Sequence, residues 1–224
     1  MSQPAAPCFL YLQIPADVES AAYLEGAATL AAGHGGKVLA AARAGAVECL
    51  EHGTPAAAVL LVEFAEPEPL RSLWSDARHQ DLLGTLGAST GTLAMQVPGL
   101  PYIGLPDMPD IPTTASVRPP EGRGPRAYMV IQGTGTDQER MDRYRDIILP
   151  MIAEQGAYYT AFEITGNVEV LAGEWPWGIY AISRWPDHAA GHAFWDSERY
   201  QNVAIPLRTG AGTFHVHFFT GTAG

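Results

Sequence analysis

Two histidines near the end of the chain share one face of a predicted strand. Residues 213–220 alternate in character and place His215 and His217 two positions apart. Side chains two apart on a strand point the same way, so the pair can present two imidazoles to one ligand. Neutral imidazole binds zinc, iron and copper, and Glu163 or Glu174 could add a ligand. Alternatively, one imidazole acts as a general base, since its unperturbed pKa of ~6.5 suits proton transfer near neutrality, or both line a polar interior.

A second pair of histidines, His188 and His192, has the spacing of neighbours on one helical face. That spacing suits a metal, but it is equally typical of a solvated helix face beside the apolar stripe of Ala190, Ala193 and Phe194. Our favoured interpretation places no metal at either pair.

Aromatic residues concentrate in the second half of the chain. Strand aromatics normally build a core, but their excess here, with Pro176 between two tryptophans, suits an aromatic-walled pocket. Arg208 is a natural partner for a carboxylate or an enolate, the alternative being a surface salt bridge. The residues expected to line the pocket are Tyr144, Tyr158, Phe162, Trp175, Trp177 and Trp195.

Hydrophobic periodicity predicts the elements that position these side chains. In the second half it indicates helices over 137–155 and 187–195, and strands over 128–132, 158–164, 168–171, 177–184 and 213–220. The strands 158–164 and 168–171 are expected to form a hairpin about residues 165–167. The order β-α-β-β-α-β is that of the ferredoxin-like unit, whose sheet has one face that its own helices leave bare.

The chain repeats itself at an offset of 121 residues. Trp74 and Trp195 open similar segments, and a Gly-Thr pair follows each at the same distance, at residues 91–92 and 212–213. Glycines, prolines and tryptophans in one register indicate an internal duplication. We therefore predict an α+β fold in which two ferredoxin-like β-α-β-β-α-β units of one chain cover each other's bare sheet faces.

The predicted division is a first unit over 1–97, a Pro-rich linker over 98–126 and a second unit over 127–224. Prolines at the density of the linker remove amide donors and block helix formation. The linker also holds hydrophobic residues, which favour packing along a surface: Leu100, Tyr102, Ile103, Leu105, Met108 and Ile111.

The two halves differ in their polar residues. Because the two halves carry unequal sets of polar residues, we expect one active or binding pocket instead of two. The alternative is that one copy has lost its polar residues by neutral drift. The residues Glu51, Tyr200 and Arg208 have Ala172, His79 and Gly87 at the equivalent positions.

The composition excludes several kinds of partner. The 224 residues include 24 acidic and 13 basic side chains, a formal net charge of −11, which repels phosphate backbones and anionic lipids. Nucleic acid and membranes are therefore poor partners, and a small-molecule substrate is the expected one. No stretch reaches the ~18 apolar residues of a membrane span, and no signal peptide is recognisable, so we expect a cytoplasmic protein.

The second half resembles the family known as domain of unknown function 1330, in the dimeric α+β barrel superfamily, and the first half looks like a diverged copy. The matching residues are Tyr144, Gly156, Val168, Glu169, Val170, Leu171, Gly173, Trp175, the run 194–201 and Arg208. The resemblance covers about 90 residues per half. In the superfamily two such units pack sheet to sheet as a homodimer, so the resemblance implies a pseudo-dimeric α+β barrel within this one chain. The chain is expected to be a monomer with this pseudo-dimer fold, or to dimerise again.

The superfamily resemblance implies a cofactor-independent enzyme, of isomerase, cyclase or lyase type, on a small oxygenated and partly aromatic metabolite, in which an enclosed pocket holds a reactive carbonyl. We assign His217 or His215 as the base, Arg208 and Tyr200 as oxyanion partners and Glu51 as a second acid. No cofactor is expected. The alternatives are a non-catalytic binding or self-resistance protein, and a metal-dependent enzyme using the two histidines of the last strand.

Overall fold

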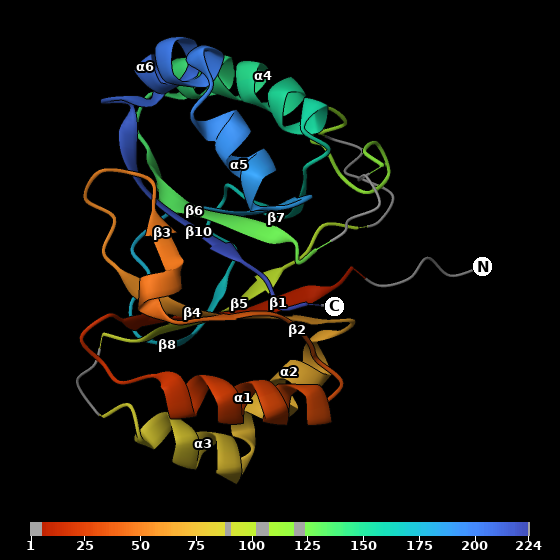
Figure 1. Ribbon diagram of the computed structural model, residues 1–224, viewed down its shortest axis with the longest axis vertical. Coiled ribbons are helices and arrows are strands. Elements are labelled where there is room, and N and C mark those ends of the chain that lie inside the picture. Colours follow the sequence, from red (N-terminus) through yellow and green to blue (C-terminus); the bar gives the residue numbers. More distant parts are fainter. Residues whose placement is uncertain (1–5, 88–90, 102–107, 119–123, 224) are drawn as a thin grey trace.

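The computed structural model describes residues 6–87, 91–101, 108–118 and 124–223 and has four layers (Figure 1). Two sheets face each other in the middle, and helices cover the outer face of each. The first half contributes β1 (Cys8–Pro15), α1 (Ala21–Gly33), β2 (Lys37–Ala42), β3 (Val47–Cys49), β4 (Ala57–Phe64), α2 (Pro67–Ser75), α3 (Ala77–Gly84) and β5 (Leu93–Pro98). The second half contributes β6 (Ala127–Gly135), α4 (Gln138–Glu154), β7 (Tyr158–Glu163), β8 (Glu169–Ala172), β9 (Ile179–Trp185), α5 (His188–Trp195), a π-turn (Tyr200–Ala204), α6 (Ile205–Arg208) and β10 (Gly212–Thr220).

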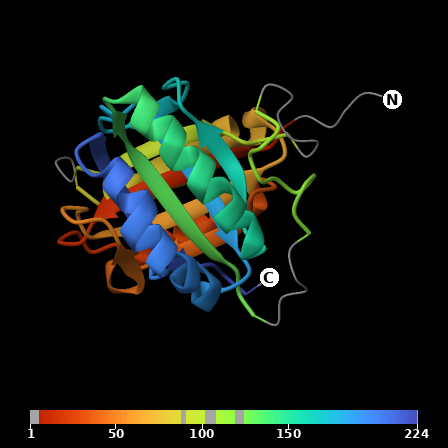
Figure 2. The same cartoon turned by 90° about the horizontal axis from the view of Figure 1, so that it is seen from above.

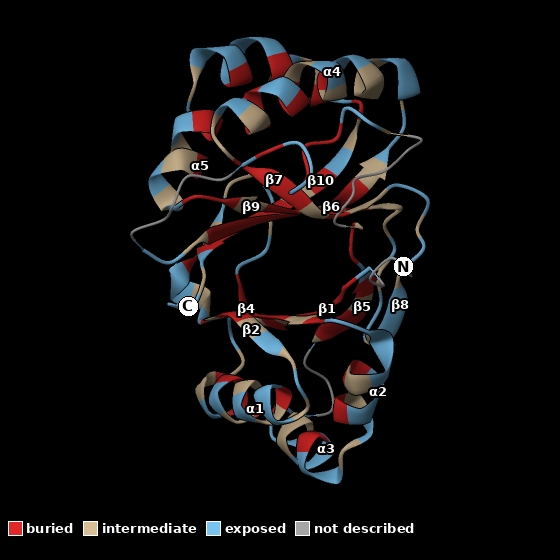
Figure 3. Ribbon diagram, turned by 90° about the vertical axis from the view of Figure 1, so that its right-hand side faces the viewer, coloured by how far each residue is buried: buried red, intermediate tan, exposed pale blue. Residues whose placement is uncertain are grey.

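The predicted fold class is confirmed: two ferredoxin-like units pack sheet to sheet as a pseudo-dimeric α+β barrel. The strand orders are β2-β4-β1-β5-β8 and β3-β10-β6-β9-β7. Each sheet therefore holds four strands of its own half and one strand of the other half. Figure 3 shows the buried strands of the two sheets lying between the two helical layers.

The predicted hairpin of the second half is wrong. β7 pairs with β9 in one sheet, whereas β8 pairs with β5 of the other. In the first half β3 leaves its own sheet in the same way and pairs with β10. The turn at residues 165–167 leads the chain to the other sheet instead of folding it back on itself, so the two short strands are exchanged reciprocally.

Three apolar clusters hold the layers together, and strand alternation assigns side chains to them. Along β10, Phe214, Val216 and Phe218 face the helices, while Phe219 faces the other sheet. The central cluster contains Tyr11 of the first half and joins the two halves into one core.

Capping residues in the sequence fix the starts of the helices over the second sheet. A carboxylate oxygen of Asp137 accepts the Arg140 amide at 3.1 Å, and Asp187 accepts the Ala190 amide at 2.8 Å. After α4, Gly156 takes φ +70°, the left-handed conformation that ends a helix. In Figure 2 α4 and the segment of α5 and α6 cross over the second sheet side by side.

The described part of the linker packs as the sequence analysis expected. Leu100 and Ile111 are buried against the helical face of the second sheet. The Leu100 amide donates to the Thr160 carbonyl, and the Tyr159 amide donates to Pro112, both at 2.8 Å, so the linker covers the edge strand β7. Tyr102, Ile103 and Leu105 lie outside the described residues. Among the residues described, no helix combines the length and the apolar character that crossing a bilayer requires.

Candidate functional site

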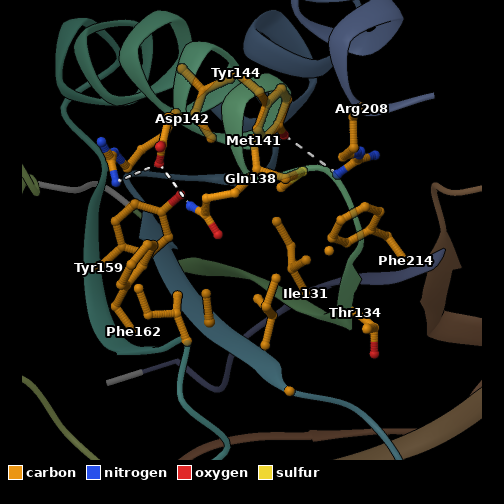
Figure 4. Close-up of a pocket in the computed structure, with 17 residues that line it drawn as sticks. Ile131, Thr134, Gln138, Met141, Asp142, Tyr144, Tyr159, Phe162, Arg208 and Phe214 are labelled. Carbon is orange, nitrogen blue, oxygen red and sulfur yellow. Dashed lines mark hydrogen bonds and ion pairs between the residues drawn. The ribbon is translucent and has the colours of Figure 1, made fainter. Parts of the chain in front are cut away.

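A cavity of about 220 Å³ lies between the second sheet and helix α4, in the second half of the chain. Its walls are mostly apolar and come from β6, α4, β7, β9 and β10. In Figure 4 Arg208 and Phe214 lie on one side of it and Tyr159 and Phe162 on the other. The lining residues that carry the following description are Ile131, Gln138, Met141, Asp142, Tyr144, Arg145, Tyr159, Phe162, Arg208 and Phe214.

Arg208 places a buried positive charge at the inner end of this cavity. Its side chain is 2% exposed, and its guanidinium lies 5.1 Å from the ring centre of Phe214, 5.5 Å from Tyr144 and 5.7 Å from Trp195. Nη2 forms an ion pair with Glu51, and Nη1 donates to the Tyr144 hydroxyl at 3.4 Å. Among the described residues the buried Nε has no hydrogen-bond partner. A ligand oxygen would satisfy this donor after a small shift of the side chain, because Nε has less than 1 Å² of accessible surface.

The charge on Arg208 is secured by its neighbours. Burial lowers the pKa of the guanidinium, but Tyr144, Tyr200 and Glu51 raise it by more, so its pKa stands above the ordinary value. Glu51 comes from the first half, in the segment that follows β3, and its side chain is 28% exposed. The segment after the exchanged strand thus delivers a carboxylate to Arg208 of the other half.

Tyr144 lines the inner end of the cavity, and Tyr200 lies behind it. The hydroxyls of Tyr144 and Tyr200 are 3.1 Å apart, and burial raises the pKa of Tyr200 well above its usual value. Tyr200 also packs against Trp195, with ring centres 4.9 Å apart. Tyr200 therefore supports Tyr144 from behind, since it does not line the cavity itself.

The open end of the cavity carries polar side chains from the first two turns of α4. Asp142 accepts from the amide of Gln138 at 2.9 Å and pairs with Arg145 at 3.2 Å. Gln138 is exposed, and Asp142 is 44% exposed, so this end faces solvent. The structure thus separates a buried cation from a solvent-facing carboxylate by an apolar chamber.

The two histidines of β10 share one face as predicted, but that face is turned away from the cavity, toward the other sheet. His217 is 1% exposed; its Nε2 donates to the Pro55 carbonyl at 2.8 Å, which leaves Nδ1 to accept from Tyr11 at 3.3 Å. Burial lowers its pKa, so the ring is neutral. His215 packs against Trp177 at 4.9 Å, and burial lowers its pKa as well. The structure therefore does not bring either histidine to Arg208 or to the cavity.

The aromatic residues predicted to line one pocket are divided between the cavity and places away from it. Tyr144 and Phe162 line the cavity, and Trp195 lies behind it against Arg208. Trp175 donates to Gln132 at 3.1 Å on the face between the sheets. The Tyr158 hydroxyl accepts from Arg184 at 3.1 Å, also away from the cavity.

Sequence reasoning missed the polar rim of the cavity. Gln138, Asp142 and Arg145 recur at spacings of four and three, so they share a helical face with the apolar Met141 and Ile148. Polar residues that interrupt an inward-facing stripe are the signal that could have identified them.

Residues 126–222 match the family model described as “Domain of unknown function (DUF1330)”. No curated relative matches the chain in sequence. Among solved structures, a “putative monooxygenase” from Lactobacillus acidophilus NCFM is 9% identical over 97% of this chain and 95% of its own, with a TM-score of 0.50. Another “putative monooxygenase”, from Fusobacterium nucleatum subsp. nucleatum, is 7% identical over 98% and 94%, also with a TM-score of 0.50. The second unit of this chain is thus similar to the domain-of-unknown-function 1330 family, and the whole chain shares the dimeric α+β barrel fold of these two structures.

Proposed function

We propose that this protein is an enzyme that moves a proton on a small, partly aromatic, oxygenated molecule bound in the cavity beneath α4. The observation that carries the proposal is the buried Arg208, whose Nε has no partner among the described residues and whose cavity has mostly apolar walls. A buried cation with an unused donor favours an anionic oxygen, and aromatic walls favour a planar apolar body.

The residues of the cavity suit the formation of an enolate. Arg208 would bind the developing oxyanion, and the Tyr144 hydroxyl, which accepts from Arg208, is placed to donate to the same oxygen. Glu51 and Tyr200 act as positioning residues, because they hold Arg208 and Tyr144. Asp142, across the chamber, is the carboxylate that would accept a proton from a carbon several bonds away from the oxygen held by Arg208, as a conjugated substrate allows. Our proposal thus retains Arg208, Tyr144, Tyr200 and Glu51 from the sequence analysis and does not include His215 or His217.

We also propose that the chain arose by duplication and fusion of one unit, with the division 1–97, 98–126 and 127–224. Equivalent polar pairs support this origin. The Tyr23 hydroxyl lies 3.1 Å from Nε2 of His79, and the Tyr144 and Tyr200 hydroxyls, 121 residues later, are also 3.1 Å apart. The halves then diverged, since the first half has Gly87 where the second half has Arg208.

Exchange of carbon-bound hydrogen tests the enzymatic proposal without knowledge of the natural substrate. Phenylpyruvate is a suitable probe because it combines an aromatic ring, a carboxylate and an enolisable carbon. In D₂O, nuclear magnetic resonance should show faster loss of its C3 protons with the protein than with buffer. Oxygen uptake is recorded in parallel, because the two similar structures are described as monooxygenases.

Two variants sharpen the result. Asp142→Asn should abolish the acceleration while retaining binding, whereas Asp146→Asn, on the exposed face of the same helix, should behave as the wild type. Binding of phenylpyruvate with no exchange in any form would contradict the proposed chemistry and favour a non-catalytic binding protein.

A further inference from the structure

A second cluster of chemically active side chains lies where the two halves meet, outside the cavity. It consists of Glu48 on β3 and His188 and His192 on α5, whose ligand atoms all lie within 4.8 Å of one another. Nε2 of His188 lies 2.5 Å from one carboxylate oxygen of Glu48, and Nε2 of His192 lies 2.9 Å from the other. The three side chains are 33–41% exposed, so solvent ions can reach them.

The fold brings these residues together through strand exchange. β3 of the first half pairs with β10, and Glu48 lies opposite Phe218. Residues directly opposite in an antiparallel pair point to the same face, so Glu48 faces the helical layer of the other half. Helix α5 packs closely on the ring of Phe218. A Cβ atom added at Gly191 would lie only 2.2 Å from that ring. The ring of Phe218 in turn packs on His188 at 4.7 Å and on His192 at 5.5 Å.

One of the imidazoles is oriented in the manner of a metal ligand. Nδ1 of His192 lies 3.0 Å from the carboxylate of Asp196, one turn later on the same helix. With Nδ1 held by Asp196, Nε2 points at Glu48 and donates a proton to that carboxylate, and a metal ion would take the place of this proton. Carboxylates that hold the second ring nitrogen of a ligating histidine are the usual outer shell of metal sites.

We propose that Glu48, His188 and His192 form a site for a divalent transition metal, zinc by preference, that bridges the two halves of the chain. Two imidazoles four residues apart on a helix, with one carboxylate from another element, supply three ligands and leave a position for water. Tetrahedral zinc, with bonds of about 2.0–2.1 Å, holds its ligand atoms about 3.3 Å apart. The three partly exposed side chains need only small movements to open to that separation.

The equivalent place in the first half indicates that this position requires a cation. The residue 121 positions after Glu48 is Glu169 on β8, and it pairs with Arg71 on α2 at 3.5 Å. Arg71 is in turn the counterpart of His192, and Pro67 is the counterpart of His188. A guanidinium thus neutralises Glu169, whereas the matching carboxylate of Glu48 faces two imidazoles, which can bind a metal ion as a guanidinium cannot.

Metal titration of the full chain tests the proposal. Protein stripped with a chelator is titrated with Zn²⁺ at about pH 7.5, because zinc competes with protons for imidazole ligands at lower pH. We expect one ion per chain and a rise in the temperature of unfolding, because the ion joins β3 to α5. With Co²⁺, visible absorption bands of a tetrahedral complex with nitrogen and oxygen ligands should appear at the same stoichiometry.

Variants of surface residues assign the ligands with little risk to folding. His192→Asn and Glu48→Gln should weaken zinc binding by about 100-fold, and Asp196→Asn by about tenfold, as expected for an outer-shell residue. Glu169→Gln, the matched change in the first half, should leave binding unchanged. The proposal is overturned if the wild type binds no zinc at 100 µM, or if His192→Asn retains full affinity while His215→Asn loses it.

Discussion

Arg208 and Glu51 form the pair on which the candidate site depends. The guanidinium is almost fully buried, and its carboxylate partner comes from a residue 157 positions earlier in the chain. Leaving a buried charge without its partner costs far more than losing a pair on the surface. The ion pair therefore links the chemistry of the second half to the integrity of the first.

Glu51→Gln should lower the free energy of unfolding by about 2 kcal/mol, less than for a fully buried pair because Glu51 retains some solvent contact. Urea denaturation measures the change. The matched control is Glu154→Gln, which breaks the exposed pair between Arg199 and Glu154 and should cost less than about 0.5 kcal/mol. Equal effects of the two changes would contradict the burial argument.

The buried histidine of β10, His217, leads to a prediction about how stability depends on pH. Burial lowers the pKa of His217, so below about pH 6.5 the unfolded chain binds a proton that the folded chain does not. This contribution to stability is complete above pH 6.5 and is lost as the pH falls toward the lowered folded pKa. His215 and His79, whose pKa values burial also lowers, act in the same direction.

His217→Gln should therefore flatten the fall in unfolding free energy between pH 7 and pH 5, measured by urea denaturation with a chelator present. His52→Gln, at an exposed position, should leave the slope unchanged. An unaltered slope in His217→Gln would mean that the ring is not the buried neutral group described above.

At the scale of residues, the sequence predicted which side chains belong to the site better than it predicted which of them are in contact. Arg208, Glu51, Tyr144 and Tyr200 could be singled out because the halves differ at three of the four positions. Their contact could not be predicted, since it depends on β3 crossing into the other sheet. Conversely, the regular alternation that correctly placed His215 and His217 on one face gave no information about which layer that face meets.

At the scale of elements, the exchanged strands β3 and β8 determine where the chemistry is placed. β3 carries Glu48 to α5, and the residues just after it carry Glu51 to Arg208. Helices and long strands were predictable from periodicity and caps. The partners of the two short strands were not, because an apolar run followed by a glycine-containing turn is equally consistent with a hairpin and with a crossing.

Gly173 offers a test of the exchange, because it follows β8 directly. It has φ +78°, and a Cβ there would lie 2.3 Å from the Thr92 carbonyl oxygen at the start of β5. Gly173→Ala should cost about 3 kcal/mol of unfolding free energy, from left-handed strain together with displacement of β8.

Gly166→Ala is the matched control, since Gly166 has φ +79° but nothing within 4 Å of its Cβ. It should cost only the conformational penalty of about 1 kcal/mol. Thermal and urea denaturation compare the two variants, and equal costs would argue against close packing of β8 on the first sheet.

At the scale of the molecule, one core spans both halves. The cluster between the sheets joins Tyr11, Val59 and Met95 of the first half to Val130 and Tyr180 of the second. The four-layer arrangement was predictable, because a four-stranded sheet with helices on one face needs a cover and the chain contains a second copy of the same unit. The location of the cavity was not predictable, since it depends on side-chain volumes on both sides of one layer.

The shared core predicts a single cooperative unfolding transition. Leu60→Ala in the first half and Ile148→Ala in the second should each shift the single unfolding transition of the whole chain. Each should lower the free energy of unfolding by about 2–4 kcal/mol. Far-ultraviolet circular dichroism and tryptophan fluorescence should report coincident curves. Two separable transitions, each shifted by only one of the variants, would contradict a joint core.

The central claim is that Arg208 makes the cavity of the second half an anion-binding site, and calorimetric titration with phenylpyruvate tests it most directly. We predict saturable binding of one molecule per chain, weakened by about 10- to 100-fold in Arg208→Gln and unchanged in Arg143→Gln, on the exposed face of α4. The double variant Arg208→Gln with Glu51→Gln, which removes both charges together, should show the same loss and so excludes an effect of the unpaired carboxylate. Equal affinity of the wild type and a folded Arg208→Gln variant would contradict the account.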